Sequence, residues 1–274
     1  MVLITSQSNP RISKLQTLHT PRGRKKSGLF LMEGPHLLEA LLDARLWPYE
    51  VYYQPDLLQR THAGRALLER LLHTPDLSSQ QLIEVSEQVI EAVSDTQQTQ
   101  GVVSVLPLNA FTPDAIRRRR AVANRPALLI LDDIADPGNM GTILRTALAA
   151  NVALVLLTPN CVDWFSPKVV RAAAGAHLAL PVESNASWDI IELRVAEHAP
   201  GRVLLAEAGS ALYYEQDLRQ PFALVIGNEA HGPSSAARAL ATSTISIPLA
   251  NNVESLNAAM AAGIILYEAV RQRH

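Results

Sequence analysis

The stretch ALLILDDIADPGNMGTILRTA, residues 127–147, decides the fold. It opens with a short apolar run, Ala127–Leu131, passes through a polar turn that holds a proline and a glycine, and ends in a segment of helical character. A strand that is apolar at every position is typical of a parallel sheet buried on both faces. The stretch therefore predicts a strand, a turn and a helix of an α/β domain.

Similar apolar runs recur through the rest of the chain. Amphipathic segments separate several of them, which is the arrangement expected of a parallel sheet covered by helices on both faces. The further predicted strands are Ala153–Leu157, Leu178–Val182, Val203–Ala206, Phe222–Ile226 and Thr244–Ile247. We assign residues 126–274 to this domain.

The first strand is followed by a loop that leads into a helix. Pro137-Gly138 is expected to form a turn, Asn139 can cap the helix that begins beyond it, and Arg145 lies one to two turns further on. An ordinary turn with a solvated arginine would have the same sequence. The glycine spacing matches neither the dinucleotide fingerprint nor the P-loop, which disfavours nucleotide-phosphate binding of those kinds.

Two further loops follow predicted strands, GNEAHGPS at 227–234 and IPLANNVESLN at 247–257. Ligands of open α/β sheets bind beyond the carboxyl ends of the strands, so these loops are candidate sites. Gly227 allows close approach of a ligand, and Glu229 places a charge beside a buried strand end. Ser255 and Asn257 begin the last helix, where such side chains either cap the helix or order a site. The last helix is predicted to bury a face formed by Leu256, Met260, Ile264 and Tyr267.

The N-terminal part alternates helical and strand-like pieces over residues 33–107. Strands are predicted at Val51–Tyr53 and Val102–Val105. A helix is indicated by the spacing of Leu37, Leu38, Leu41 and Leu42. Residues 108–125 are polar and contain arginine and proline, which predicts a linker, although Phe111–Asp114 resembles the start of a short helix. The chain is thus divided into a domain at 1–107, a linker at 108–125 and a domain at 126–274.

The distribution of charge is more informative than its sum. The 274 residues contain 24 Lys and Arg against 26 Asp and Glu, a formal charge of -2 that argues against a uniformly basic nucleic-acid-binding surface. The first 32 residues nevertheless carry six basic residues and no acidic one, and a second basic block spans Arg117–Arg120. Each block alone is typical of a solvated segment, but together they could form one surface that faces phosphates.

The single cysteine excludes an internal disulfide and a multi-cysteine metal site, and the spacing of the histidines gives no reason to assign a metal. The start MVLITSQSNPR lacks the order of a signal peptide, and no apolar run reaches the ~18–20 residues that span a bilayer. We therefore expect a cytoplasmic protein without a membrane partner.

Taken in order, the three loops resemble the motifs of the SpoU (TrmH-type) RNA 2′-O-ribose methyltransferases of the SPOUT superfamily. The motifs are N-x-G-x-x-x-R-T-A at 139–147, G-N-E-x-x-G at 227–232 and I-P-L-x-x-x-V-E-S-L-N at 247–257. The segment SPKVVRAAAGA at 166–176 is also similar to this family, as are SNPR at 8–11, FLMEG at 30–34 and QGV at 100–102 of its N-terminal domain. The resemblance covers essentially the whole chain.

The resemblance implies a fold and a set of partners. The C-terminal α/β domain would contain a parallel sheet and a deep trefoil knot that binds S-adenosylmethionine in a bent conformation, and a smaller N-terminal α/β domain would bind the RNA substrate. The chain would form a homodimer whose active site is completed across the interface. Ribosomal RNA is favoured as the substrate, and the reaction needs no metal.

The resemblance also assigns roles to individual residues. Arg145 would be the catalytic arginine, supported by Asn139 and Glu229, while Ser255 and Asn257 would order the knot and the active site. The residues that would line the S-adenosylmethionine pocket are Gly227, Ile247 and Leu256, with Thr158 as a weaker candidate. The candidate RNA contacts are Arg11, Arg24, Lys25, Lys26 and Arg171.

Two alternatives stay open, a transfer RNA 2′-O-methyltransferase and an inactive RNA-binding assembly factor of the same family. The chain departs from the usual motifs at Ala230-His231, at Asn251-Asn252 and after Asn257, where it reads AAMAA. Asn251 need not break its loop, because asparagine tolerates left-handed backbone geometry better than most residues. The departures bear on cofactor affinity.

Overall fold

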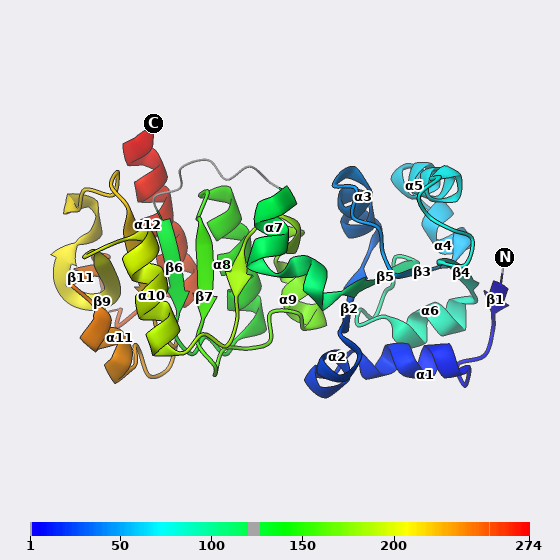
Figure 1. Ribbon diagram of the computed structural model, residues 1–274, viewed down its shortest axis with the longest axis horizontal. Coiled ribbons are helices and arrows are strands. Elements are labelled where there is room, and N and C mark those ends of the chain that lie inside the picture. The colour runs from blue at the N-terminus through cyan, green and yellow to red at the C-terminus, as the bar shows by residue number, and fades with distance from the viewer. Residues whose placement is uncertain (1, 120–126, 252) are drawn as a thin grey trace. The chain divides into compact units, whose positions relative to one another are not determined.

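The computed structural model describes residues 2–119, 127–251 and 253–274 (Figure 1). Contacts divide the chain into two compact units. Unit 1 comprises Met1–Ala110 and Phe165–Arg171, and unit 2 comprises Phe111–Trp164 and Ala172–His274. The segment Phe165–Arg171 therefore packs with unit 1, although the chain on either side of it belongs to unit 2.

Unit 1 is an α/β unit built on a mixed five-stranded sheet with the order β1-β4-β3-β5-β2. The β1–β4 and β3–β4 pairs are parallel, and β5 runs antiparallel to both β3 and β2. The strands are β1 (Val2–Ile4), β2 (Leu29–Glu33), β3 (Glu50–Tyr53), β4 (Leu82–Val85) and β5 (Val102–Pro107). The helices are α1 (Pro10–Thr17), α2 (Pro21–Ser27), α3 (Pro35–Asp43), α4 (Pro55–Gln59), α5 (His62–His73) and α6 (Glu87–Val93).

The alternation of side chains along the strands gives unit 1 two cores. On β3, Tyr52 packs in one apolar cluster with residues of α1 and α6, while Val51 and Tyr53 pack in a second cluster with residues of α3 and α5. Figure 1 shows α1 and α6 on one side of this sheet and α3 to α5 on the other. The strands predicted at Val51–Tyr53 and Val102–Val105 are confirmed, and the four leucines predicted for α3 are all buried.

Unit 2 contains a six-stranded sheet with the order β11-β9-β10-β6-β7-β8, in which every neighbouring pair is parallel. The strands are β6 (Ala127–Leu131), β7 (Leu154–Leu157), β8 (Val182–Glu183), β9 (Val203–Leu212), β10 (Phe222–Ile226) and β11 (Ser243–Ser246). The helices are α7 (Pro113–Arg119), α8 (Pro137–Ala149), α9 (Pro167–Ala172), α10 (Trp188–His198), α11 (Ser235–Leu240) and α12 (Ala258–Arg273), with α9 extending from unit 1 into unit 2 at its last residue. Two short 3-10 helices of unit 2 are η2 (Ala176–Leu178) and η3 (Tyr213–Glu215), and a third, η1 (Leu108–Phe111), extends from unit 1 into unit 2 at its last residue. The predicted parallel α/β sheet is confirmed.

One predicted strand of unit 2 is largely wrong. Residues 178–182 are apolar and three of them are buried, but the run begins in η2 and only Val182 belongs to a strand, β8. An apolar run reports burial, and burial alone does not distinguish a strand from a packed turn. The bounds of β6 and β10, by contrast, are those that the sequence predicts.

The region predicted as a linker is partly folded. Residues 108–119 form η1 and α7, where Phe111 and Ile116 are buried and Thr112 Oγ1 accepts from the Ala115 amide at 3.3 Å. The buried Phe111 and Ile116 anchor this stretch, and the arginines and the proline beside them favour its prediction as a linker. The remaining predicted linker residues, 120–125, lie outside the described residues.

The last helix buries a different face from the one predicted. Met260 and Tyr267 are 58 % and 51 % exposed, and Leu256 precedes the helix. The buried positions of α12 are Ala258, Ala259, Ala262, Ile265, Leu266 and Ala269. Small alanines allow α12 to lie close to α8, where Gly263 faces Thr146. Within the described residues, no helix is long and apolar enough to cross a membrane.

Candidate functional site

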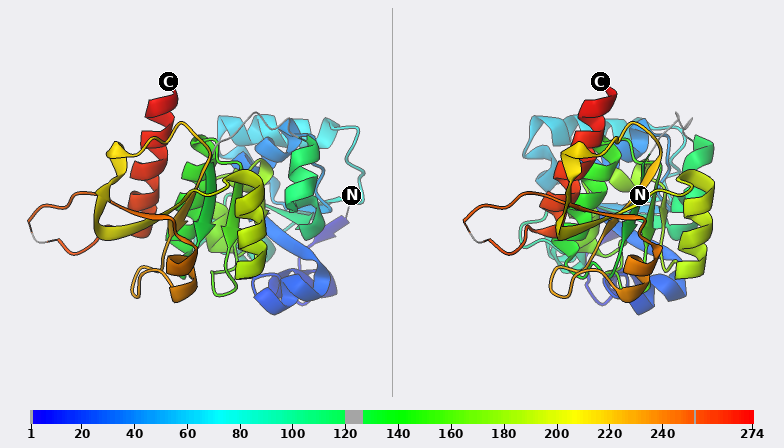
Figure 2. Two further views of the ribbon diagram at one scale, coloured as in Figure 1. Left: turned by 60° about the vertical axis from the view of Figure 1, so that its left-hand side comes forward. Right: turned by 90° about the vertical axis from the view of Figure 1, so that its left-hand side faces the viewer.

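The carboxyl edge of the unit 2 sheet brings the three candidate loops together. β6 and β10 are neighbours, and β9 lies between β10 and β11. Because the strands are parallel, the loops that follow β6, β10 and β11 emerge at the same edge. Figure 2 shows that the last of them, between β11 and α12, projects away from the body of unit 2.

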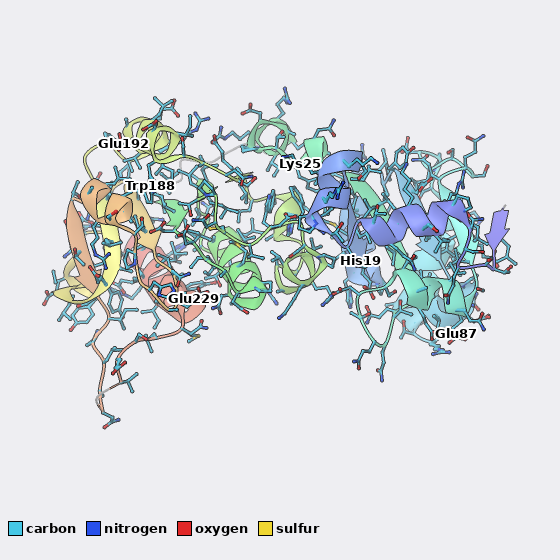
Figure 3. All side chains as sticks on the ribbon, turned by 90° about the horizontal axis from the view of Figure 1, so that it is seen from below. His19, Lys25, Glu87, Trp188, Glu192 and Glu229 are labelled. Atoms are coloured by element: carbon cyan, nitrogen blue, oxygen red, sulfur yellow. The ribbon has the colours of Figure 1, made fainter. Side chains whose placement is uncertain are left out.

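Three of the predicted catalytic side chains form one hydrogen-bonded chain, which we call the Asn139 bridge. The amide of Asn139 donates from Nδ2 to Glu229 Oε1 at 2.8 Å, and its Oδ1 accepts from Asn257 Nδ2, also at 2.8 Å. One asparagine thus uses both its donor and its acceptor to join the loops after β10 and β11 to α8. Figure 3 labels Glu229 at this edge of the sheet.

The Asn139 bridge depends on which residues cap the N-termini of α8 and α12. α8 begins earlier than predicted, with Asp136 as its N-cap accepting from the Asn139 amide at 2.7 Å and Pro137 in its first turn. The prediction that Asn139 caps this helix is therefore wrong, and the aspartate leaves the Asn139 side chain available for the bridge. Asn257, as predicted, is an N-cap, and its Oδ1 accepts from the amides of Ala259 and Met260 at 2.9 and 3.2 Å.

Two residues without a predicted role attach the loop after β10 to the loop after β6. Asp132 is 1 % exposed, and its Oδ2 accepts from the Ser234 amide at 2.7 Å. Asn228 donates from Nδ2 to the Asp133 carbonyl at 2.7 Å, and its Oδ1 accepts from the backbone amides of Ala230 and His231. The sequence signal that could have indicated Asp132 is an aspartate directly after the fully apolar run Ala127–Leu131.

Gly227 is required by a close approach within the same loop. A Cβ at this position would lie 2.5 Å from Pro233 N and 2.7 Å from Pro233 Cα.

Asn251, in the loop after β11, has a φ of +56°, the left-handed geometry that asparagine is expected to tolerate there. Asn252 lies outside the described residues.

A cavity of about 360 Å³ opens beside this edge. Among the predicted site residues, Gly227, Glu229, Ile247, Ser255 and Leu256 line it. Its apolar part comes mainly from the ends of β10 and β11 and from α12, and Ala206 and Glu207 of β9 form a further part of the wall. An apolar recess with a few polar groups fits a flat aromatic ligand that carries polar substituents.

Thr158 does not belong to this lining. It is 2 % exposed, its hydroxyl donates to Asp133 Oδ1, and it accepts from the Asp133 amide, both at 2.9 Å. Asp133 has a φ of +58°, a conformation uncommon for a residue with a side chain. Thr158 thus holds a strained turn in place, and the structure gives it no contact with the cavity.

Arg145 lies on α8, six residues beyond Asn139 and therefore about 9 Å further along the helix axis. It is exposed, and among the described residues no ion pair involves it. An exposed guanidinium without a carboxylate partner can donate hydrogen bonds to a phosphate from outside the chain.

The predicted RNA contacts of unit 1 differ in exposure. Arg11, Lys25 and Lys26 are exposed, and Figure 3 labels Lys25 on α2. Arg24 is 2 % exposed and donates from Nη1 to the Leu18 carbonyl at 2.7 Å, so its guanidinium supports the turn between α1 and α2. Its position in the basic cluster gave no sign of this, and the structure corrects its assignment as a surface contact.

Three of the other basic residues, Arg171, Arg117 and Arg119, contact side chains of their own unit. Arg171 donates to Asp95 within unit 1. In unit 2, Arg117 lies 3.6 Å from Asp114, and Arg119 lies over the ring of Phe111 at 5.6 Å. Arg120 is outside the described residues. Among the residues that are described, no three His, Cys, Asp or Glu side chains are grouped to hold a metal ion.

Comparison with known proteins covers both units. The model of the SpoU rRNA Methylase family matches residues 126–267, and that of the MRM3-like substrate binding domain matches residues 9–104. A relative in Synechocystis, described as an uncharacterized tRNA/rRNA methyltransferase, is 36 % identical over 98 % of this chain and 94 % of its own length. The 23S rRNA (guanosine(2553)-2′-O)-methyltransferase RlmP of Bacillus subtilis is 30 % identical over 97 % of this chain and 98 % of its own.

Among solved structures, the chain is similar to the SpoU methyltransferase AviRb from Streptomyces viridochromogenes in complex with the cofactor AdoMet. The TM-score is 0.80 at 28 % identity, over 97 % of this chain and 99 % of that one. A structure of an RNA 2′-O ribose methyltransferase gives a TM-score of 0.79 at 29 % identity over 99 % of both chains.

Proposed function

Because the chain belongs to the SpoU rRNA methylase family, we propose that it transfers a methyl group from S-adenosylmethionine to a ribose 2′-hydroxyl of ribosomal RNA. The observation that carries the proposal is the Asn139 bridge, which joins three motifs of the family beside a cavity of about 360 Å³. The reaction is supported by the similarity to RlmP, a 2′-O-methyltransferase, and the cofactor by the similarity to AviRb in complex with AdoMet.

The residues of the chain have to align two reactants rather than supply a reactive group. S-adenosylmethionine supplies the methyl group from a sulfonium, and in-line displacement by the ribose oxygen then needs orientation and loss of the hydroxyl proton. Arg145 is effectively always protonated, so an ordinary general-base role is physically awkward. It pairs with a backbone phosphate and orients the ribose hydroxyl, and its charge assists the loss of the proton.

The cavity is the proposed site of S-adenosylmethionine. Backbone groups at Gly227 and Ile247 face the adenosine part, and Leu256 covers the adenine. Ser255 and Asn257 order this site, in which a deep trefoil knot of the chain holds the cofactor in a bent conformation. The close packing at Gly227 supports the assignment, because a side chain there would displace Pro233.

We assign the homodimer to the exposed face of α12. Met260 and Tyr267 are large, apolar and more than half exposed, and they are seven residues apart on one helix face. A second copy of the chain would cover them and complete the active site. Met260→Glu with Tyr267→Glu should convert a dimer to a monomer in light scattering, whereas Leu193→Glu on α10, at a side chain that is 52 % exposed, should not.

The substrate is assigned to unit 1 and the chemistry to unit 2. The domain at 1–107 binds structured RNA, the stretch 108–125 connects it, and the domain at 126–274 transfers the methyl group in the cytoplasm. Ribosomal rather than transfer RNA is supported by the named substrates of RlmP and of the 23S rRNA (uridine(2479)-2′-O)-methyltransferase of Streptomyces viridochromogenes.

Mapping of 2′-O-methyl groups in cellular RNA, with and without the gene, tests this function. We expect one ribosomal site to disappear and to return with the wild-type gene but not with Arg145→Ala. Loss of a transfer RNA site would reassign the substrate. An unchanged map, together with defective ribosome assembly, would favour the inactive assembly factor.

A further inference from the structure

β9 departs from regular pairing beside the cavity. It pairs with β11 at Thr244↔Leu205 and next at Ile245↔Ala211, which leaves residues 206–210 outside the ladder between the two strands. Irregular insertions of this kind re-aim side chains and are frequent next to active sites. Here the interruption coincides with the cavity wall, which includes Ala206 and Glu207.

Glu207 lies beside the loop after β10. β9 and β10 pair up to Val225↔Leu205, and two residues further on the two chains carry Glu207 and Gly227. Both line the cavity. The Glu207 carboxylate is therefore beside the backbone that we assign to the adenosine part of the cofactor.

Arg238 fixes this carboxylate. It lies on α11 and donates from Nη2 to Glu207 Oε1, and from Nη1 to the Pro233 carbonyl in the loop after β10. The guanidinium thus connects β9 to the loop after β10. From the described residues, Glu207 Oε2 accepts no hydrogen bond, so one carboxylate oxygen is held and the other is available to a ligand.

The chemistry of this pair favours a hydroxyl ligand. The adjacent guanidinium offsets the charge of Glu207, so a cation in the cavity would gain little from it, whereas a hydroxyl donor still finds an oriented, charge-assisted acceptor. Acidic side chains bind ribose hydroxyls in this way at the strand ends of other α/β sheets. We propose that Glu207 binds the ribose hydroxyls of the adenosine part of the cofactor and that Arg238 is its positioning residue, an inference that rests on the proposed function.

Calorimetric titration tests the inference with two probes, S-adenosylhomocysteine and its 2′,3′-dideoxy analogue. Wild-type protein should bind S-adenosylhomocysteine at least about tenfold more tightly than the dideoxy analogue. This is the difference in affinity expected when the analogue cannot form one or two charge-assisted hydrogen bonds. In Glu207→Ala the preference should fall below about threefold, because the hydroxyls lose their acceptor. Arg238→Met should reduce the preference to an intermediate value.

A matched control is Glu183→Ala. Glu183 is also a half-buried glutamate on a strand of unit 2 and accepts from an arginine, Arg194, at 2.9 Å, but it does not line the cavity. Its removal should leave the preference unchanged. Thermal unfolding of each variant tests whether the fold is retained. Glu207→Gln is a second variant at the same position, which keeps the shape of the side chain and removes only its charge.

Three results would overturn the inference. The preference for the ribose hydroxyls could persist in Glu207→Ala, or it could be absent from wild type. Alternatively, Glu207→Ala could weaken S-adenosylmethionine selectively over S-adenosylhomocysteine, which would assign Glu207 to the sulfonium charge. If wild-type protein bound neither cofactor form, the proposed function and the inference would fail together. Binding with the expected preference, but without rRNA methylation, would refute the function alone.

Discussion

Three candidate residues of unit 2 are held by one another, whereas three candidate residues of unit 1, Arg11, Lys25 and Lys26, are exposed. Asn139, Glu229 and Asn257 lie on three different segments and are joined by two hydrogen bonds of 2.8 Å. In unit 1, Lys25 and Lys26 are exposed on the short helix α2. Methyl transfer depends on fixed geometry, whereas attraction of a polyanion depends mainly on the amount and sign of charge. Changes in unit 2 should therefore act on rate, and changes in unit 1 on salt-dependent affinity.

The largest effect is expected at Arg145. Arg145→Ala should lower kcat by roughly a thousandfold, the usual loss when a preorganised charged group is removed from a transition state, while S-adenosylmethionine affinity stays within about threefold. Single-turnover methylation of a ribosomal RNA fragment and calorimetry measure the two quantities. Arg145→Lys should restore part of the rate, since it keeps the charge but not the bidentate geometry. Retained turnover in Arg145→Ala would end the proposed role.

The two units should also respond differently to pH. Complete burial lowers the pKa of His177, in unit 2, to about 4. Between pH 6.5 and about 4 the unfolded chain binds a proton that the folded unit excludes, so the stability of unit 2 falls as the pH falls, by roughly 3 kcal/mol in total. The protection factors of amides in β6 and β10, which correct for the intrinsic pH dependence of exchange, should fall over this range, and His177→Gln should flatten the dependence. His231→Gln, at an exposed loop position, is the control.

Unit 1 has the opposite dependence. Burial, followed by the hydrogen bond to Glu50, raises the pKa of Tyr52 above its ordinary value of 10. Above pH 10 the unfolded chain therefore loses a proton that the folded unit keeps, and the stability of unit 1 falls as the pH rises. An equal fall of the protection factors in both units at either extreme of pH would contradict the assignment of these residues.

Much of the fold could be predicted because apolar patterning reports burial directly. The bounds of β6 and β10 follow from fully apolar runs between polar turns, and the parallel sheet follows from their spacing. Patterning failed where burial and secondary structure diverge, as at residues 178–182. It also failed on α12, where the buried face is formed by four alanines together with Ile265 and Leu266, while Met260 and Tyr267 are exposed.

The sequence identifies several residues of the site but not the hydrogen bonds that join them. The residues of the Asn139 bridge were identifiable, but the bonds between them depend on Asp136 taking the cap of α8, which local preference among Asp and Asn does not decide. Asp132 accepts a hydrogen bond from the amide of Ser234, which is 102 residues away in the sequence. A local sequence pattern does not reveal a contact between residues so far apart. Arg24 shows the converse, since a lysine and arginine cluster in sequence conceals one buried member.

A smaller effect than that of Arg145 is expected at the bridge itself. Asn139→Asp removes the donor to Glu229 and sets two carboxylates against each other, so kcat should fall about 10- to 100-fold while cofactor affinity changes little. Asn160→Asp is a matched control, because Asn160 also donates its amide to a carboxylate of unit 2, Asp133 Oδ2 at 3.3 Å, outside the cavity lining. A similar loss in both variants would mean that the bridge has no specific role.

The smallest effect is expected on the surface of unit 1. Lys25→Gln with Lys26→Gln should weaken RNA binding about tenfold at low salt and reduce the salt dependence by up to about 0.9 per lost phosphate contact. S-adenosylmethionine binding should be unaffected, because the change removes charge from α2 and leaves the cavity of unit 2 intact. Filter binding at a series of salt concentrations measures both the affinity and its slope.

The comparison within unit 1 can be sharpened by removing the same amount of charge elsewhere. Arg60 and Arg70 form ion pairs at 3.3 and 2.7 Å with carboxylates of the same unit, so Arg60→Gln with Arg70→Gln lowers the net charge equally but releases two acidic partners. If only net charge matters, both double variants weaken RNA binding alike. If the exposed lysines contact phosphates, the slope changes only for the Lys25 and Lys26 pair, and Arg24→Gln lowers stability without changing the slope.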